Sequence, residues 1–293
     1  MTPATELPPL PPERAGPPLP PALAAWRQEM MDARASGRFR IDPAPEELVL
    51  GQRRVLRLTP TGRPRGRVFH LHGGGFRNGV PEMEGPYADR LMRACQVEVL
   101  LPEYRLASED PFPAGLNDAW AALQAYAKQD PQTPLIVSGQ SAGGGLAAGL
   151  AVLAAHHGVA LAGLVLIAPW LDLTVSAPSY ERNRASDPLF SPEAAAAAAG
   201  LYLQGGDARH PLASPLFAPT QGLPPTLIAV GAGEILYDDG ARFHERLQVA
   251  GICCEFLAVP GMEHVAVTRS ADLPGSAETF ARIARFVSGI CGD

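Results

Sequence analysis

From about residue 47 onward, short apolar runs alternate with longer segments whose apolar residues recur every three or four positions. The runs match strands that are buried on both faces of a sheet, and the longer segments match amphipathic helices. We therefore expect an α/β fold with a mostly parallel sheet between helices. The expected strands are residues 49–58, 67–71, 97–101, 135–138, 163–167, 226–230 and 254–259, and the expected helices are 87–95, 115–128, 144–157, 239–250 and 277–288.

The N-terminal segment does not follow this alternation. Residues 1–22 are dense in proline, which favours an extended or poorly ordered chain. Residues 22–35 have a helical pattern, with Leu23, Trp26 and Met30 on one face. Because a plain linker would not need such a stripe, we expect this helix to dock on the rest of the protein.

A second irregular segment lies between the strands at 163–167 and 226–230. It contains a proline-rich loop and then Ser191 and Pro192, which have the residue types of a helix N-cap and first turn, before the run 194–199 of alanines. Helix propensity explains the alanines better than a role in leaving room for an acyl group. An interruption this long is usually functional. We expect residues 1–45 and an insertion at about 173–212 to form a cap on a catalytic domain of residues 46–293.

Composition narrows the function classes. The 293 residues are 46% hydrophobic, which is enough for a large buried core, and they carry a net charge of −6 without a Lys/Arg-rich run, which disfavours nucleic acid as a partner. Apolar stretches such as 161–171 are too short to span a bilayer, and the N-terminus lacks a signal-peptide pattern. The four cysteines form no C-x-x-C pair, so a zinc site or disulfide framework is disfavoured. We expect a cytoplasmic protein without a metal, an organic cofactor or a membrane partner.

Ser141 lies in a G-x-S-x-G pentapeptide, residues 139–143, between an expected strand and an expected helix. This context is typical of a nucleophile elbow, a sharp turn that exposes the serine hydroxyl. The backbone N–H of Ala142 would begin the helix without an intrahelical partner and could stabilise an oxyanion. A second motif, residues 72–75 (His-Gly-Gly-Gly), follows another expected strand and supplies further backbone N–H groups. Together the two motifs indicate a serine hydrolase that performs acyl transfer.

The serine needs a base, and seven histidines are available. Only His264 lies in a turn just beyond an expected strand, 254–259, where α/β sheets place their chemistry. The others lie inside a strand, in the glycine-rich loop, at the far end of a helix, in the insertion or in a charged helical stretch. His264 also fits the chain order nucleophile, acid, histidine.

The acid should follow the strand at 226–230, where three carboxylates occur. Glu234 is nearest to the strand end, whereas Asp238 and Asp239 open the next helix. Carboxylates at a helix start are ordinarily caps or partners of the helix dipole. We therefore expect Glu234 to orient His264.

The chain resembles the hormone-sensitive-lipase-like esterases (bacterial family IV) of the α/β-hydrolase superfamily. The resemblance extends over nearly everything after residue 45 and is carried by residues 72–75, 104–107, 111–114, 139–143, 169–172, 187–189, 212–216, 230–239 and 261–264. It implies an α/β-hydrolase fold with an eight-stranded sheet, a helical cap, and hydrolysis of short-acyl esters. It also implies that Gly74, Gly75 and Ala142 are the oxyanion-hole donors.

The chain departs from this family pattern in three places. Gln140 precedes the nucleophile where an acidic residue is usual, and Glu234 stands where aspartate is more common. Val265 and Ala266 follow the histidine where an aromatic residue is common nearby, which could widen that side of the pocket.

Several functions remain open at this stage. The leading hypothesis is a carboxylic-ester hydrolase that acts on a small-molecule ester, and a homodimer is among its open oligomeric states. A lactone or amide hydrolase could use the same three residues, because leaving-group selectivity depends on pocket shape. A ligand receptor on this fold is disfavoured because all three catalytic positions are kept. A long-chain lipase is disfavoured because the insertion mixes charged residues with its alanines.

Overall fold

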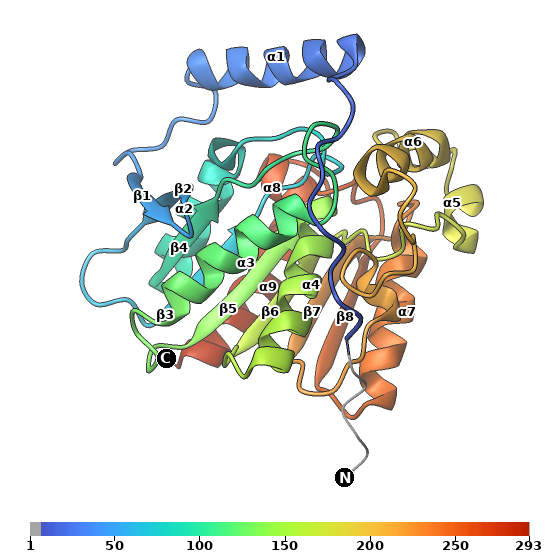
Figure 1. Cartoon of the computed structure of the whole chain (residues 1–293). Helices are drawn as coiled ribbons and strands as arrows, with labels where there is room; N and C mark the ends of the chain where they lie inside the picture. The colour runs from blue at the N-terminus through green and yellow to red at the C-terminus, as the bar shows by residue number, and fades with distance from the viewer. Residues whose placement is uncertain (1–6, 293) are drawn as a thin grey trace.

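The computed structural model describes residues 7–292, and within them eight strands form one sheet of mostly parallel strands (Figure 1). The spatial order is β1-β2-β4-β3-β5-β6-β7-β8, in which β2 runs antiparallel to both β1 and β4 and the other adjacent pairs are parallel. The α/β-hydrolase fold class expected from the sequence is confirmed. The strands are β1 (Glu46–Leu50), β2 (Arg53–Leu58), β3 (Gly66–Leu71), β4 (Val97–Pro102), β5 (Leu135–Gln140), β6 (Gly163–Ile167), β7 (Thr226–Gly231) and β8 (Cys254–Val259).

The first expected strand, residues 49–58, is wrong as a single element. It is a hairpin of β1 and β2, in which Glu46 pairs with Arg57 and Leu50 with Arg53. The two turn residues, Gly51 and Gln52, have φ values of 56° and 67°. Two consecutive positive φ angles are typical of the tight turns that join antiparallel strands. The Gly-Gln pair lies within a run of strand-forming residues, and for this reason the periodicity alone did not reveal the turn.

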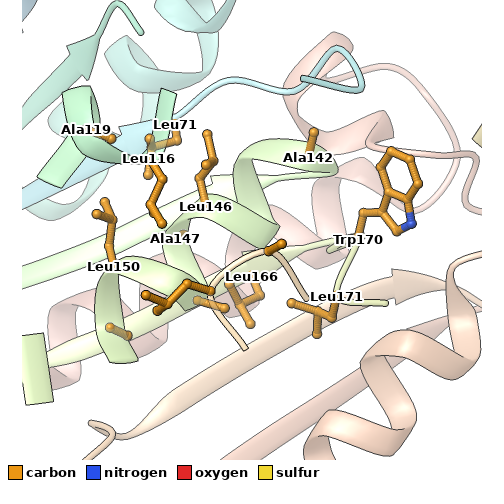
Figure 2. Close-up of a cluster of buried hydrophobic side chains, with 14 of the residues drawn as sticks. Leu71, Leu116, Ala119, Ala142, Leu146, Ala147, Leu150, Leu166, Trp170 and Leu171 are labelled. Carbon is orange, nitrogen blue, oxygen red and sulfur yellow. The ribbon is translucent and has the colours of Figure 1, made fainter. Parts of the chain in front are cut away.

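Helices cover both faces of the sheet. Alternate strand residues divide the core, since Phe69 and Val137 belong to one buried cluster and Val68 and Ile136 to another. The first cluster includes side chains of α3 and α4, such as Leu116, Leu146 and Leu150 in Figure 2, and the second packs against α2 and α9. The helices are α1 (Pro21–Ala35), α2 (Gly85–Cys95), α3 (Ala114–Ala127), α4 (Ala142–His157), α5 (Pro178–Arg182), α6 (Pro192–Leu203), α7 (Tyr237–Val249), α8 (Ala266–Arg269) and α9 (Ser276–Cys291), with 3₁₀ turns η1 (Pro81–Glu84) and η2 (Pro215–Phe217).

The proline-dense segment is extended and anchored where it is described. The backbone N–H of Gly16 donates to the carbonyl of Glu109 at 2.7 Å, and Glu13 pairs with Arg105 at 2.7 Å. Residues 1–6 of the expected N-terminal segment lie outside the described part. The chain then enters α1, which crosses the molecule at the top of Figure 1, and α5 and α6 of the insertion lie at the upper right of the same view.

The apolar face expected on α1 lies partly in the core and partly at the edge of a cavity. Leu23 is buried, whereas Trp26 is 41% exposed and, together with Met30, lines the cavity described below. Arg27 holds the helix in place because its guanidinium pairs with Glu109 at 2.7 Å and donates to the carbonyl of Arg77 at 2.7 Å. Arg34 near the end of the helix pairs with Glu82 at 2.8 Å, so α1 docks mainly through two arginines and less through apolar burial.

Candidate active site

Ser141 lies between β5 and α4 in a backbone conformation that side chains rarely adopt. Its φ and ψ angles are 51° and −123°, and α4 begins at the next residue, Ala142. Gly143 allows the helix to approach the end of β3 closely, because a Cβ there would lie 2.2 Å from the carbonyl oxygen of His72. The strand–turn–helix arrangement expected for a nucleophile elbow is present.

Three side chains that are distant in the sequence form one chain of hydrogen bonds. Nε2 of His264 lies 2.9 Å from Oγ of Ser141, and Nδ1 of His264 lies 2.6 Å from Oε2 of Glu234. Glu234 and His264 are both buried, with exposed fractions of 1% and 8%. This is the arrangement of nucleophile, base and orienting acid that a serine hydrolase uses.

The two alternative carboxylates point elsewhere. Asp238 pairs with Arg182 at 2.8 Å and accepts the backbone N–H of Ser179, both in the insertion. Asp239 accepts the backbone N–H groups of Leu171 and Asp172, at 2.9 Å each. Both carboxylates lie in the first turn of α7, but they fasten it to neighbouring segments and do not cap it.

The insertion also holds the loop of the acid. The amide of Asn183 donates to the carbonyl oxygen of Glu234 at 2.7 Å. Asp187 accepts the backbone N–H of Ile235 at 3.0 Å and that of Phe190 at 3.1 Å. Sequence reasoning did not assign these positions a role, although the pair Asp187-Pro188 stood out in the loop.

The glycine-rich loop lies directly beside the nucleophile. Gly74 and Gly75 have φ values of 111° and 63°, and a Cβ on Gly74 would lie 1.8 Å from the carbonyl oxygen of Asn78, so only glycine fits there. Tyr104 steadies the loop by donating its hydroxyl to the carbonyl of His72 at 2.8 Å. Both glycines line a cavity of about 660 Å³ together with Ser141 and His264.

The environment of His264 changes its proton affinity in two opposing ways. Burial disfavours the charged imidazolium, but the hydrogen bond and the negative charge of Glu234 favour it, and the net result is a pKa raised above the ordinary 6.5. The ring also stacks on Phe190 at a centroid distance of 5.9 Å. The residues that follow His264, Val265 and Ala266, are not aromatic. The insertion instead places an aromatic ring, that of Phe190, against the histidine.

A buried polar network behind the nucleophile escaped sequence analysis. The amide of Gln140 donates to Glu84 and accepts the hydroxyl of Thr268. Glu84, which is 1% exposed, also contacts Nε2 of His70 at 3.3 Å. The carboxylate expected beside the serine is therefore supplied by Glu84, from η1. Only the unusual glutamine in the elbow pointed to this arrangement.

The described residues contain neither a metal-binding cluster nor a membrane-spanning helix. In residues 7–292, no group of three or more His, Cys, Asp or Glu side chains is arranged to hold a metal ion. In the same part of the chain, no helix combines the length and apolar character needed to cross a membrane. The cysteines Cys95, Cys253, Cys254 and Cys291 are free.

Comparison with known proteins places this chain in a family. Residues 68–268 match a family with the α/β-hydrolase fold. The chain is 35% identical to an esterase of Acinetobacter venetianus, over 76% of this chain and 75% of that protein. It is 34% identical to the carboxylesterase NlhH of Mycobacterium tuberculosis, over 73% and 70%.

Solved structures of esterases also resemble this chain. An esterase from the bacterial hormone-sensitive lipase family superposes with a TM-score of 0.85 at 32% identity, covering 92% of both chains. The structure of EstE5 soaked with p-nitrophenyl butyrate gives a TM-score of 0.84 at 31% identity, covering 95% of both chains. The chain belongs to the hormone-sensitive-lipase-like esterases of the α/β-hydrolase superfamily, which are carboxylic-ester hydrolases.

Proposed function

We propose that this protein is a serine carboxylesterase that hydrolyses short-acyl esters through an acyl-enzyme intermediate. The observation that carries the proposal is the unbroken hydrogen-bond chain from Glu234 through His264 to Ser141. Nδ1–H of His264 donates to the Glu234 carboxylate, which leaves Nε2 as the acceptor for the serine proton.

The reaction then proceeds in two halves. Oγ of Ser141 attacks the acyl carbon as its proton moves to Nε2 of His264, and the tetrahedral intermediate collapses when the imidazolium protonates the leaving alcohol. Water repeats the sequence on the acyl-enzyme and releases the acid. Glu234 stays ionised throughout and stabilises the imidazolium, in keeping with the raised pKa of His264.

The backbone N–H groups of Gly74, Gly75 and Ala142 are the proposed oxyanion donors. Ala142 begins α4, so its amide has no intrahelical acceptor. Such preorganised donors act where negative charge develops in the transition state, and losing one typically costs about a hundredfold or more in rate.

The short-acyl preference rests on the cavity and on the relatives. Charged side chains stand among the apolar ones around the 660 Å³ cavity, which suits a compact ester better than a long alkyl chain. An acetyl-hydrolase of Streptomyces hygroscopicus is 36% identical over 68% of this chain and 67% of that protein. Hydrolysis of a lactone or amide by the same residues is the alternative, and a panel of matched esters, lactones and amides decides between them.

The proposed cap consists of residues 1–45 and the insertion at 173–212. Trp26 and Met30 from the first segment and Leu189, Phe190 and Ala194 from the second all line the cavity. Such a cap would exclude water and shape the acyl pocket. A homodimer and a cytoplasmic location complete the proposal, and light scattering and cell fractionation test them.

Labelling with a fluorophosphonate tests the nucleophile. We expect the reagent to modify Ser141 alone, and Ser141→Ala to abolish labelling and lower turnover by several orders of magnitude without loss of folding. Ser288→Ala, on α9, is the matched control and should label normally. Labelling or turnover that survives Ser141→Ala would identify another nucleophile.

A further inference from the structure

The charges that line the active-site cavity have the opposite sign to the protein as a whole. The chain carries a net charge of −6, yet the described lining contains three arginines and a single carboxylate, Glu84. Glu84 is engaged by Gln140 and His70, and Arg269 pairs with Glu263 at 2.9 Å. The remaining lining arginines are Arg38 and Arg77.

Arg77 is the one that belongs to the catalytic loop. It follows Gly75 by two residues, and a Cβ built on Gly75 would lie 3.5 Å from Nε and 3.8 Å from Nη2 of Arg77. Its backbone is fixed on both sides, because its N–H donates to Gly74 at 3.1 Å and its carbonyl accepts from Arg27 at 2.7 Å. The guanidinium is therefore held beside the proposed oxyanion hole by a rigid loop.

The part of the chain that the structure describes places no counter-charge on this guanidinium. Among residues 7–292, Arg77 forms no ion pair, and its Nε is buried without a hydrogen-bond partner. The guanidinium carbon lies 5.8 Å from the ring centre of Trp26. Burial lowers the pKa of Arg77, which means that the cation is desolvated without compensation. A partly buried cation is normally paired, so the missing partner points to a ligand.

We propose that Arg77 binds a carboxylate carried by the substrate, so that this enzyme prefers esters that bear an anionic group close to the scissile bond. Arginine suits this task because its planar donors match a carboxylate with two parallel hydrogen bonds. The inference rests on the proposed function, since it concerns the substrate of the same site. Arg77 would then determine which substrates bind, and it would take no part in the proton transfers of the reaction.

Kinetics on three matched esters test the proposal. Ethyl butyrate is the neutral reference, monoethyl succinate carries the carboxylate on its acyl part, and carboxymethyl butyrate carries it on its alcohol part. In the wild-type enzyme we expect one of the two anionic esters to have the higher kcat/KM. Arg77→Gln should lower its kcat/KM relative to ethyl butyrate by about tenfold or more, mainly through KM, as expected for a lost charged hydrogen bond.

Two further variants and a change of salt concentration test whether the charge of Arg77 causes the preference for anionic esters. Arg77→Lys should keep part of the preference, because lysine keeps the positive charge but lacks the two parallel donors of the guanidinium. Arg63→Gln removes the same charge from an exposed loop outside the cavity, and its preference should match the wild type. Added salt should weaken the wild-type preference and leave that of Arg77→Gln nearly constant.

Two outcomes would overturn the inference. If Arg77→Gln slows all three esters by one factor, Arg77 acts on the oxyanion or the fold. If it changes no ratio, Arg77 only packs on Trp26.

Calorimetry of monoethyl succinate and carboxymethyl butyrate binding to Ser141→Ala, with and without Arg77→Gln, measures recognition without turnover. A failure of the esterase proposal would appear as an inactive wild type, whereas loss of anion binding in the double variant would still support the role of Arg77.

Discussion

Glu234 and Asp238 lie four residues apart, and the structure gives them different partners. Glu234→Gln keeps the size of the side chain, but its amide can donate to Nδ1 of His264 and favour the tautomer that leaves Nε2 protonated. We expect turnover to fall on the order of a thousandfold or more. Asp238→Asn is the matched control: it weakens the pair with Arg182, should cost about 1 kcal/mol of stability at most, and should leave kcat near the wild-type value. The reverse pattern would reassign the acid.

The pH dependence of the reaction should report His264. The raised pKa means that the imidazole becomes charged already above pH 6.5, so kcat/KM should fall with a midpoint above that value as the pH is lowered. The stability contribution of this pair has the opposite dependence: it is complete below the unfolded pKa and is lost as the pH rises through the folded one. In Glu234→Gln burial still lowers the pKa of His264 while the hydrogen bond and charge of the carboxylate that raise it are lost, so the residual activity should have its midpoint at lower pH. A profile that is flat to about two units below 6.5 would argue against a histidine base.

Gln140 bridges Glu84 and Thr268 where relatives usually carry an acid. Gln140→Glu removes the donor and places two carboxylates together in a buried site, so that one of them must take up a proton. We expect a loss of about 2 kcal/mol or more at pH 8 and a smaller loss at pH 5.5, measured by chemical denaturation. Glu84→Gln combined with Gln140→Glu restores a single carboxylate and should recover much of the loss. Equal stability of the single variant and the wild type at both pH values would contradict this account.

At the scale of elements, Arg27 ties α1 to the catalytic loops by hydrogen bonds, and Arg34 of the same helix pairs with Glu82 at 2.8 Å. Arg27 contacts the carbonyls of Arg77 and Ala107 and the carboxylate of Glu109. Arg27→Ala should release the helix from the cavity, raise KM for butyryl esters severalfold, and lower the melting temperature. Gln28→Ala is the control on the same helix, since Gln28 bonds only to Asp32 one turn away. If Arg27→Ala has wild-type kinetics and melting, α1 has no role in the cap.

The whole molecule sets the preferred acyl length, because the cavity lies between the sheet edge, α1 and the insertion. A butyryl group would fit among the apolar side chains of Met30, Leu189 and Phe190, whereas a palmitoyl chain would extend past the guanidinium of Arg38 or Arg77. We expect kcat/KM for 4-nitrophenyl butyrate to exceed that for the palmitate by about tenfold or more, since burying a chain beside unpaired charge forfeits much of its transfer energy. A higher value for the palmitate would exclude the short-acyl proposal.

The features that the sequence by itself determined follow from short patterns of neighbouring residues. The sheet and its covering helices follow from apolar periodicity, and Ser141 and the glycine loop from motifs within five residues. Glu234 and His264 followed from their place after strands, because the carboxyl ends of parallel strands meet at one edge. The fold prediction is confirmed, and the structure brings these three side chains together, while their catalytic roles stay a prediction.

Only the tertiary structure decided the contacts between segments far apart in the chain. Glu84 meets Gln140 across 56 residues, and Phe190 of the insertion stacks on His264. Arg77 has no ion-pair partner among residues 7–292 because the fold brings none of their carboxylates to it. Even the first strand needed the folded backbone to reveal its turn at Gly51 and Gln52. Such contacts depend on how whole elements pack, and the residues next to a side chain in the sequence do not specify which residue of another element it will touch.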